Sequence, residues 1–160
     1  MKIGILSDTH DRVKRTIRAM MEFRSRGAEV LIHCGDFTGT EVIHACSIFP
    51  TFYVFGNNDF DEEALTAAIE ETGGTCLGHG REIELAGKRI AVAHGDQLKK
   101  IRRLREADPD YLLYGHSHVA EDRADGPTRW INPGALHRAA EPSVAVLDLE
   151  TDDLHFVKIG

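Results

Sequence analysis

The chain has 160 residues, of which 42% are apolar and 28% are charged, a balance typical of a globular protein rather than a disordered or membrane-spanning one. This length predicts a single domain that covers residues 1–160. The formal net charge of -7 argues against sequence-independent binding of long nucleic acids, because such binding requires many cationic contacts to phosphate.

The first half of the chain alternates short apolar runs with amphipathic segments. The runs at 2–6, 30–33 and 51–55 predict buried strands. Helices are expected from Val13 until Gly27 stops the pattern, over 41–48 before Pro50, and from the acidic residues 61–63 to Gly73. Because strands alternate with helices, we expect these strands to pair in parallel.

The pattern changes after residue 80. Residues 82–85 and 89–92 predict an antiparallel hairpin that turns at Ala86-Gly87. One more helix is expected around Leu98, Ile101 and Leu104, followed by strands at 111–114, 129–131, 143–149 and 154–157. Two packed, mixed sheets flanked by helices accommodate so many strands better than one open sheet.

Metal-binding side chains follow five of these strands. They are Asp8 and His10, Asp36, Asn57, His94, and the pair His116 and His118. Because the carboxyl ends of strands in α/β sheets face one crevice, we expect these side chains to converge. Four histidines, two aspartates and one asparagine suit manganese, iron, nickel, cobalt or zinc. Seven ligands are too many for one ion, so the sequence predicts two ions bridged by Asp36.

The remaining histidines and cysteines lack this pattern. We assign a structural or surface role to His33, His44, His79, His137 and His155. The cysteines are widely spaced and odd in number, which predicts free thiols rather than disulfides or a thiolate zinc site. The basic residues of 99–105 are interpreted as the solvated face of a helix.

The strand-end motifs, taken together, resemble those of the calcineurin-like metallophosphoesterases. The matching segments are Asp8-Thr9-His10, Gly35-Asp36, Gly56-Asn57-Asn58-Asp59, His94-Gly95 and Gly115-His116-Ser117-His118. The small size and Asn132-Pro133-Gly134 are similar to the compact prokaryotic phosphodiesterase branch of that family.

The resemblance implies a four-layer α-β-β-α sandwich that hydrolyses a small phosphoester, in particular a phosphodiester, with a hydroxide that bridges two metal ions. It assigns one ion to Asp8, His10, Asp36 and His118, and the other to Asp36, Asn57, His94 and His116. Manganese or nickel would be the expected activators, with iron, cobalt or zinc as alternatives.

Four residues are candidates for catalysis: Asn57, Asn58, Asp59 and Arg12. Many relatives carry a histidine at the position of Asn58 that is thought to protonate the leaving group, which an amide cannot do. Asp59 is expected to orient a group at that position. Arg12 is a candidate phosphate contact, because its planar guanidinium suits phosphate oxygens.

Two other functions are compatible with the sequence. One is a protein-interaction scaffold that resembles the metallophosphoesterase-fold subunit of the retromer coat, and the other is a phosphomonoesterase. We expect a cytoplasmic protein without membrane contact, because the first apolar run meets Asp8 too early for a signal peptide. A homo-oligomer is compatible with the sequence.

Overall fold

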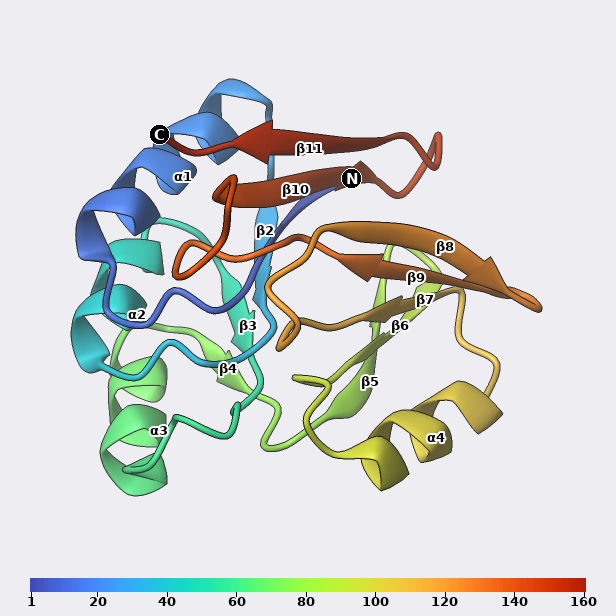
Figure 1. The fold of residues 1–160 in the computed structure, drawn as a ribbon, viewed down its shortest axis with the longest axis horizontal. Helices are drawn as coiled ribbons and strands as arrows, with labels where there is room; N and C mark the ends of the chain where they lie inside the picture. Colours follow the sequence, from blue (N-terminus) through green and yellow to red (C-terminus); the bar gives the residue numbers. More distant parts are fainter.

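The computed structural model describes residues 1–160 as eleven strands and four helices, with the strands in two sheets (Figure 1). The first sheet has the order β11-β10-β1-β2-β3-β4. Its strands are β1 (Lys2–Leu6), β2 (Val30–His33), β3 (Thr51–Tyr53), β4 (Thr75–Cys76), β10 (Ser143–Asp148) and β11 (Leu154–Lys158). Strands β1, β2 and β3 are parallel, as predicted, and β4 extends this parallel set, whereas β10 and β11 add antiparallel neighbours.

The second sheet has the order β5-β6-β7-β9-β8 and is also mixed. Its strands are β5 (Arg81–Leu85), β6 (Lys88–Val92), β7 (Tyr111–Leu113), β8 (Glu121–Asp125) and β9 (Thr128–Asn132). The predicted hairpin forms β5 and β6, while β6, β7 and β9 run parallel. Each sheet therefore has a set of parallel strands whose carboxyl ends lie at one edge.

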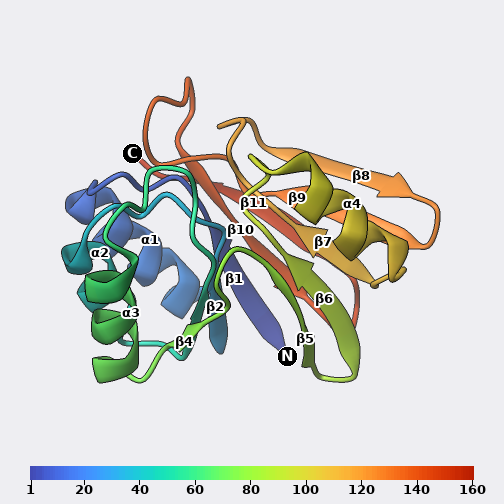
Figure 2. The ribbon, with the colours of Figure 1, turned by 90° about the horizontal axis from the view of Figure 1, so that it is seen from below.

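The helices form the outer layers. The helices are α1 (Val13–Ser25), α2 (Thr40–Cys46), α3 (Glu62–Glu71) and α4 (Leu98–Glu106). Figure 2 shows α1, α2 and α3 outside the first sheet and α4 outside the second. The expected four-layer α-β-β-α sandwich is thus confirmed.

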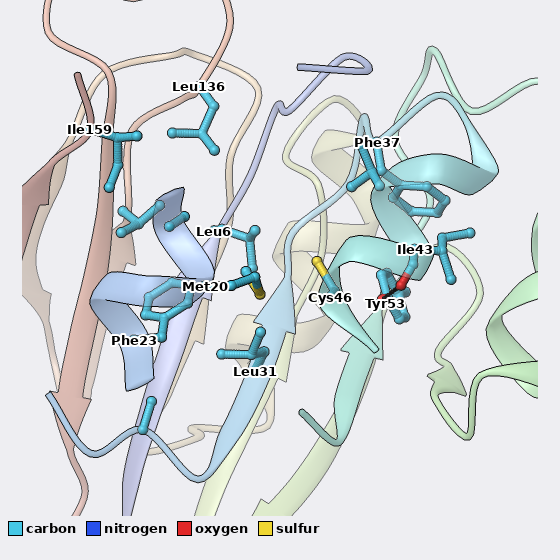
Figure 3. Close-up of a cluster of buried hydrophobic side chains, with 14 of the residues drawn as sticks. Leu6, Met20, Phe23, Leu31, Phe37, Ile43, Cys46, Tyr53, Leu136 and Ile159 are labelled. Atoms are coloured by element: carbon cyan, nitrogen blue, oxygen red, sulfur yellow. Dashed lines mark hydrogen bonds between the residues drawn. The ribbon is translucent and has the colours of Figure 1, made fainter. Parts of the chain in front are cut away.

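Three apolar clusters fill the spaces between these layers. The largest has 20 buried residues and joins the first three helices to the first sheet; Figure 3 shows Phe23 of α1 near Leu31 of β2. A second cluster of 14 residues lies between the sheets, and a third of three residues lies under α4. Burial of each large side chain stabilises the fold by about 1.5–3 kcal/mol, so the sheets that carry the site are firmly held.

Two strands were not predicted. β4 has only two residues, and β8 has the sequence EDRAD, which shows no apolar alternation. β8 forms because it pairs with β9, where Arg123 lies 4.1 Å from the centroid of the Trp130 ring. Helix α2 also ends at Cys46, two residues earlier than predicted.

All three cysteines are free, as predicted. None of the four helices has the length and apolar character that a membrane crossing requires.

Candidate metal centre

Five loops at the carboxyl ends of β1, β2, β3, β6 and β7 carry the predicted metal ligands. Their donor atoms form two groups that satisfy the geometry of a metal site, Asp8 with His10 and His118, and Asp8 with Asp36 and His94. The first sheet supplies the aspartates and His10, and the second supplies His94 and His118. The centre therefore lies where the edges of the two sheets meet.

Asp8 uses one carboxylate oxygen for the protein and leaves the other free. Its Oδ2 accepts hydrogen bonds from Ser7 Oγ at 2.7 Å and from the His116 backbone N–H at 3.0 Å. Its Oδ1 is buried without a hydrogen-bond partner, 3.1 Å from His118 Nε2, 3.7 Å from His10 Nε2 and 3.8 Å from His94 Nε2. A buried, unpaired carboxylate oxygen that faces three imidazoles has the arrangement of a metal ligand.

Asp36 lies between two histidines. Its Oδ2 is 3.3 Å from His10 Nε2 and also 3.3 Å from His94 Nε2. The same oxygen accepts a hydrogen bond from the Asn58 side-chain amide at 2.8 Å, and Oδ1 accepts one from the Asn58 backbone N–H at 2.9 Å. One carboxylate thus reaches both groups of histidine ligands, as a bridging ligand must.

His94 is fixed in one tautomer. Its Nδ1 lies 2.7 Å from the carbonyl oxygen of Cys34, so Nδ1 must carry the proton and Nε2 is left as an acceptor. The Nε2 atoms of His94 and His10 are buried and have no hydrogen-bond partner. Metal-binding histidines are commonly oriented by a carbonyl group in this way. These unpaired donor atoms fit a transition-metal centre.

The carboxylates and imidazoles polarise one another in the metal-free protein. Burial alone would raise the pKa of Asp36, but the imidazoles of His10 and His94, each 3.3 Å from its Oδ2, hold that pKa well below its usual range. The adjacent carboxylate of Asp36, aided by that of Asp8, raises the pKa of His10 to about 9. Both shifts show that the two carboxylates favour positive charge at this position, which is the environment that a bound cation requires.

The backbone is strained at the ligands themselves. A positive φ angle, which is uncommon for residues other than glycine, occurs at five of the seven candidates: Asp8 (51°), His10 (38°), Asp36 (57°), His116 (69°) and His118 (61°). Such conformations cost about 1–3 kcal/mol each and cluster at functional sites. The surrounding fold must therefore hold these loops in place.

Close packing at two glycines helps to hold the loops. A Cβ atom at Gly115 would lie 1.9 Å from Ser7 Oγ, and one at Gly35 would lie 2.6 Å from His94 Nδ1. The loops approach so closely that only glycine fits at these two positions.

Buried Asp59 also holds the loops. Its Oδ2 accepts hydrogen bonds from the backbone N–H groups of Asp36 and Gly56, both at 2.8 Å, and its Oδ1 accepts one from Thr38 at 2.7 Å. The carboxylate of Asp59 is thus directed at backbone, where it joins the loops after β2 and β3.

The ligands border a depression of about 410 Å³ that has no apolar side chain in its wall. It is lined by His10, Asp36, Asn57, Asn58, His116, His118, His137 and Arg138. Asn57 and His116 are exposed, and the His116 ring lies 5.1 Å from that of His94. The guanidinium of Arg12 is not part of this wall, because its Nε–H donates to His137 Nδ1 at 3.1 Å.

Residues 1–152 match the family model described as the calcineurin-like phosphoesterase superfamily domain. The chain belongs to this superfamily. Members are hydrolases of phosphoester bonds, and the family implies divalent metal ions, for which this calcineurin-like phosphoesterase has the ligand groups described above.

Similar proteins extend over nearly the whole chain. A phosphodiesterase from Methanocaldococcus jannaschii is 28% identical over 159 residues, which cover 94% of each chain. A probable metallophosphoesterase from Bacillus subtilis is 29% identical and covers 95% of this chain and 86% of its own. The solved structure of an archaeal phosphodiesterase superposes with a TM-score of 0.92 at 25% identity, over 99% of this chain and all of the other.

A phosphoesterase from E. coli and a zinc-bound Vps29 from Entamoeba histolytica share the fold of this calcineurin-like phosphoesterase. Their TM-scores are 0.75 and 0.67, at 20% and 17% identity, and each covers 100% of both chains.

Sequence reasoning did not place His137 and Arg138 at this centre. The His137 ring lies 4.5 Å from that of His10 and 6.3 Å from that of His118. Burial, and then the nearby His10 and Arg12, lower the pKa of His137. Both residues follow the carboxyl end of β9, a further parallel strand, and that position was the signal that could have identified them.

Proposed function

We propose that the chain is a metal-dependent phosphodiesterase that hydrolyses a small phosphoester with two divalent transition-metal ions. The observation that carries this proposal is the position of Asp36, whose Oδ2 lies 3.3 Å from the Nε2 atoms of both His10 and His94. Membership of the calcineurin-like phosphoesterase superfamily and the similarity to a named phosphodiesterase support the reaction type.

The ligands divide into two sets that share Asp36. One ion would be held by Asp8, His10, Asp36 and His118, and the other by Asp36, Asn57, His94 and His116. When bound, such ions would activate water as the nucleophile and would neutralise charge on the phosphoryl oxygens. The mixed nitrogen and oxygen ligand set favours manganese or nickel over magnesium or calcium.

The protein's own contribution is to orient these ligands. Cys34 fixes the ring of His94, and Asn58 donates to the carboxylate of Asp36. Asp59 accepts hydrogen bonds from the backbone N–H groups of Asp36 and Gly56, so its role is to position the loop that carries Asp36. No covalent protein nucleophile is required, because positioning and electrostatics supply most of the catalysis of phosphoryl transfer.

Asn58 favours a diester with a good leaving group. Its side chain lines the depression and can donate a hydrogen bond, but it cannot transfer a proton to a departing alkoxide. Phosphomonoesters of unactivated alcohols benefit most from such a proton, so we place them second among substrates.

The alternative of an interaction scaffold is favoured only by the shared fold with Vps29, at 17% identity. A scaffold has no need for three buried and unpaired ligand atoms in Asp8, His10 and His94. An enzyme that binds two ions accounts for them directly.

The test is hydrolysis of bis(4-nitrophenyl) phosphate after removal of metal and reloading with manganese, nickel or magnesium. We expect turnover with manganese or nickel, none with chelator, and a loss of at least about a hundredfold in Asp36→Asn. The exposed substitution Glu150→Gln is the control for a lost carboxylate. A folded, metal-loaded wild type with no turnover on diesters or monoesters would favour the scaffold.

A further inference from the structure

The loop after β9 is hydrogen-bonded to the loop after β1, which carries Asp8 and His10. The Leu136 backbone N–H donates to the Asp8 carbonyl oxygen at 3.2 Å, and Arg15 donates to the Leu136 carbonyl oxygen at 2.7 Å. Ala135 and Leu136 are fully buried. The two residues that follow, His137 and Arg138, therefore begin from a fixed position beside the ligands.

His137 presents one unused hydrogen-bond donor. Because Arg12 donates to its Nδ1, the neutral ring must carry its proton on Nε2. That Nε2–H has no hydrogen-bond partner in the protein, although the ring packs against His10 and borders the depression. Arg12 thereby determines which atom of His137 can donate.

Arg138 presents an unpaired cation to the same depression. It is exposed, and it forms no ion pair or side-chain hydrogen bond within the chain. An unpaired surface arginine is common and usually only solvated. Here, however, the backbone is held at a φ of 49°, a conformation that persists only where the surrounding structure enforces it.

The positive charge expected at the depression exceeds what is needed to bind the single negative charge of a simple phosphodiester. Asp36 is the only carboxylate in its wall, beside four histidines and Arg138. Two divalent ions held by Asp8 and Asp36 would already leave net positive charge for the single charge of a diester. The wall also has no apolar side chain to bind an alkyl or aryl group.

We propose that Arg138, together with the Nε2–H of His137 that Arg12 orients, binds a second anionic group of the substrate. The substrate class is then a phosphodiester in which the alcohol that stays on phosphorus also carries a carboxylate or a phosphate. This inference rests on the proposed phosphodiesterase function. Arg138 is the specificity-determining contact, and Arg12 is a positioning residue.

The experiment compares three 4-nitrophenyl phosphodiesters that share a leaving group. The second alcohol is glycolate, phosphorylated ethylene glycol or the neutral glycolamide, and the readout is the ratio of kcat/KM for each anionic ester to that of the amide. Calorimetry of the products phosphoglycolate and phosphoglycolamide measures binding without turnover. The variants are Arg138→Gln and Arg12→Gln, and Arg24→Gln, at an exposed position in the last turn of α1, is the matched control.

In the wild type we expect at least one anionic ester to be preferred over the amide. Arg138→Gln should reduce that preference about tenfold or more through KM, as expected for a lost charge-assisted hydrogen bond. Arg12→Gln should reduce it less, and Arg12→Lys should not restore it, because lysine lacks the planar guanidinium donor. The glycolate and phosphate arms show which anion is recognised.

The two possible failures are distinguishable. An active wild type whose preference is the same in Arg138→Gln and Arg24→Gln would overturn this inference and leave the phosphodiesterase intact. A wild type that hydrolyses none of the three esters with any metal would overturn the proposed function, and this inference with it.

Discussion

The Nδ1–H of His94 donates to the carbonyl oxygen of Cys34 across 2.7 Å. His94 follows β6 in the second sheet, whereas Cys34 follows β2 in the first. One hydrogen bond thus fixes the tautomer of a candidate metal ligand and connects the two sheets. Its geometry directs Nε2 toward Asp36, 3.3 Å away, and the predictions below depend on this arrangement.

Metal loading should give about two transition-metal ions per chain, because the candidate ligands form two groups that share Asp8, and Asp36 lies between His10 and His94. In Asp36→Asn we expect about one ion or fewer, since the amide is a poor bridge between two cations. Elemental analysis of dialysed protein measures the ratio, with Glu150→Gln as the control. A wild-type ratio that never exceeds about one would contradict the bridge.

Asn58→His should selectively raise the hydrolysis of unactivated monoesters relative to aryl diesters. The new imidazole could protonate a departing alkoxide, an effect typically worth about a hundredfold. Total activity should fall, because the substitution removes the hydrogen bond from Asn58 to Asp36 at 2.8 Å. Asn58→Ala removes the same bond without adding a proton donor and is therefore the matched comparison.

The measurement is the dependence of kcat/KM on leaving-group pKa in wild type, Asn58→Ala and Asn58→His. A proton donor should flatten this dependence in the histidine variant alone. Equal slopes in all three proteins would mean that residue 58 does not face the leaving group.

His33 should make the metal-free fold sensitive to acid. Burial lowers its pKa to about 3, and its ring contacts Thr9 Oγ1 at 3.1 Å and the Gly35 N–H at 3.2 Å. Because the unfolded histidine takes up a proton below about pH 6.5, the free energy of unfolding should fall by about 1.4 kcal/mol per pH unit from there towards pH 3. Above pH 6.5 this contribution is fully present.

Urea unfolding of His33→Gln between pH 7.5 and 4.5, in the presence of chelator, tests this sign. The variant should be less stable at neutral pH but should lose less stability on acidification than the wild type. The exposed substitution His155→Gln should leave the wild-type slope unchanged. If His33→Gln also leaves it unchanged, the acid response arises elsewhere.

Asp59→Asn should destabilise the protein by about 2–3 kcal/mol, because the new amide turns a donor toward a buried backbone N–H. Asp59 is only 4% exposed and accepts three such bonds. Asp61→Asn is the matched control, since Asp61 caps α3 through one backbone N–H and asparagine caps equally well. Chemical unfolding should show a lower free energy of unfolding in Asp59→Asn but not in Asp61→Asn. Equal free energies in all three proteins would contradict the role of Asp59 in holding the loops.

The four layers and the convergence of the candidate ligands could be predicted from the sequence, because they depend on periodicity and on the positions of strand ends. β8 was not, since the run from Glu121 to Asp125 is charged and becomes a strand only through its contacts with β9, such as that of Arg123 with Trp130. Local pattern carries no information on such tertiary pairing.

The residues that line the depression could be predicted from the sequence only in part. Arg12 was expected to contact phosphate directly, a role that stays untested, but its guanidinium lies against His137. The sequence separation of 125 residues hides this contact, since no helical or strand spacing connects the two. Likewise, the orientation of Asp59 toward backbone depends on how two loops meet, which residue type alone does not specify.

The division of ligands between the sheets has a consequence for folding. Neither sheet supplies all of the candidate ligands. High-affinity metal binding therefore requires the two sheets to be packed together, and it can be used to follow this last step of folding. Bound ions would link the two sheets, because they would join ligands as distant in sequence as His10 and His118. A metal ion that binds only the native state stabilises that state in proportion to the logarithm of the ion's concentration. The cellular concentration of metal would therefore set how often the two sheets separate. Amide exchange at the carboxyl ends of β1 and β7, where the candidate ligands begin, should therefore slow when metal is added.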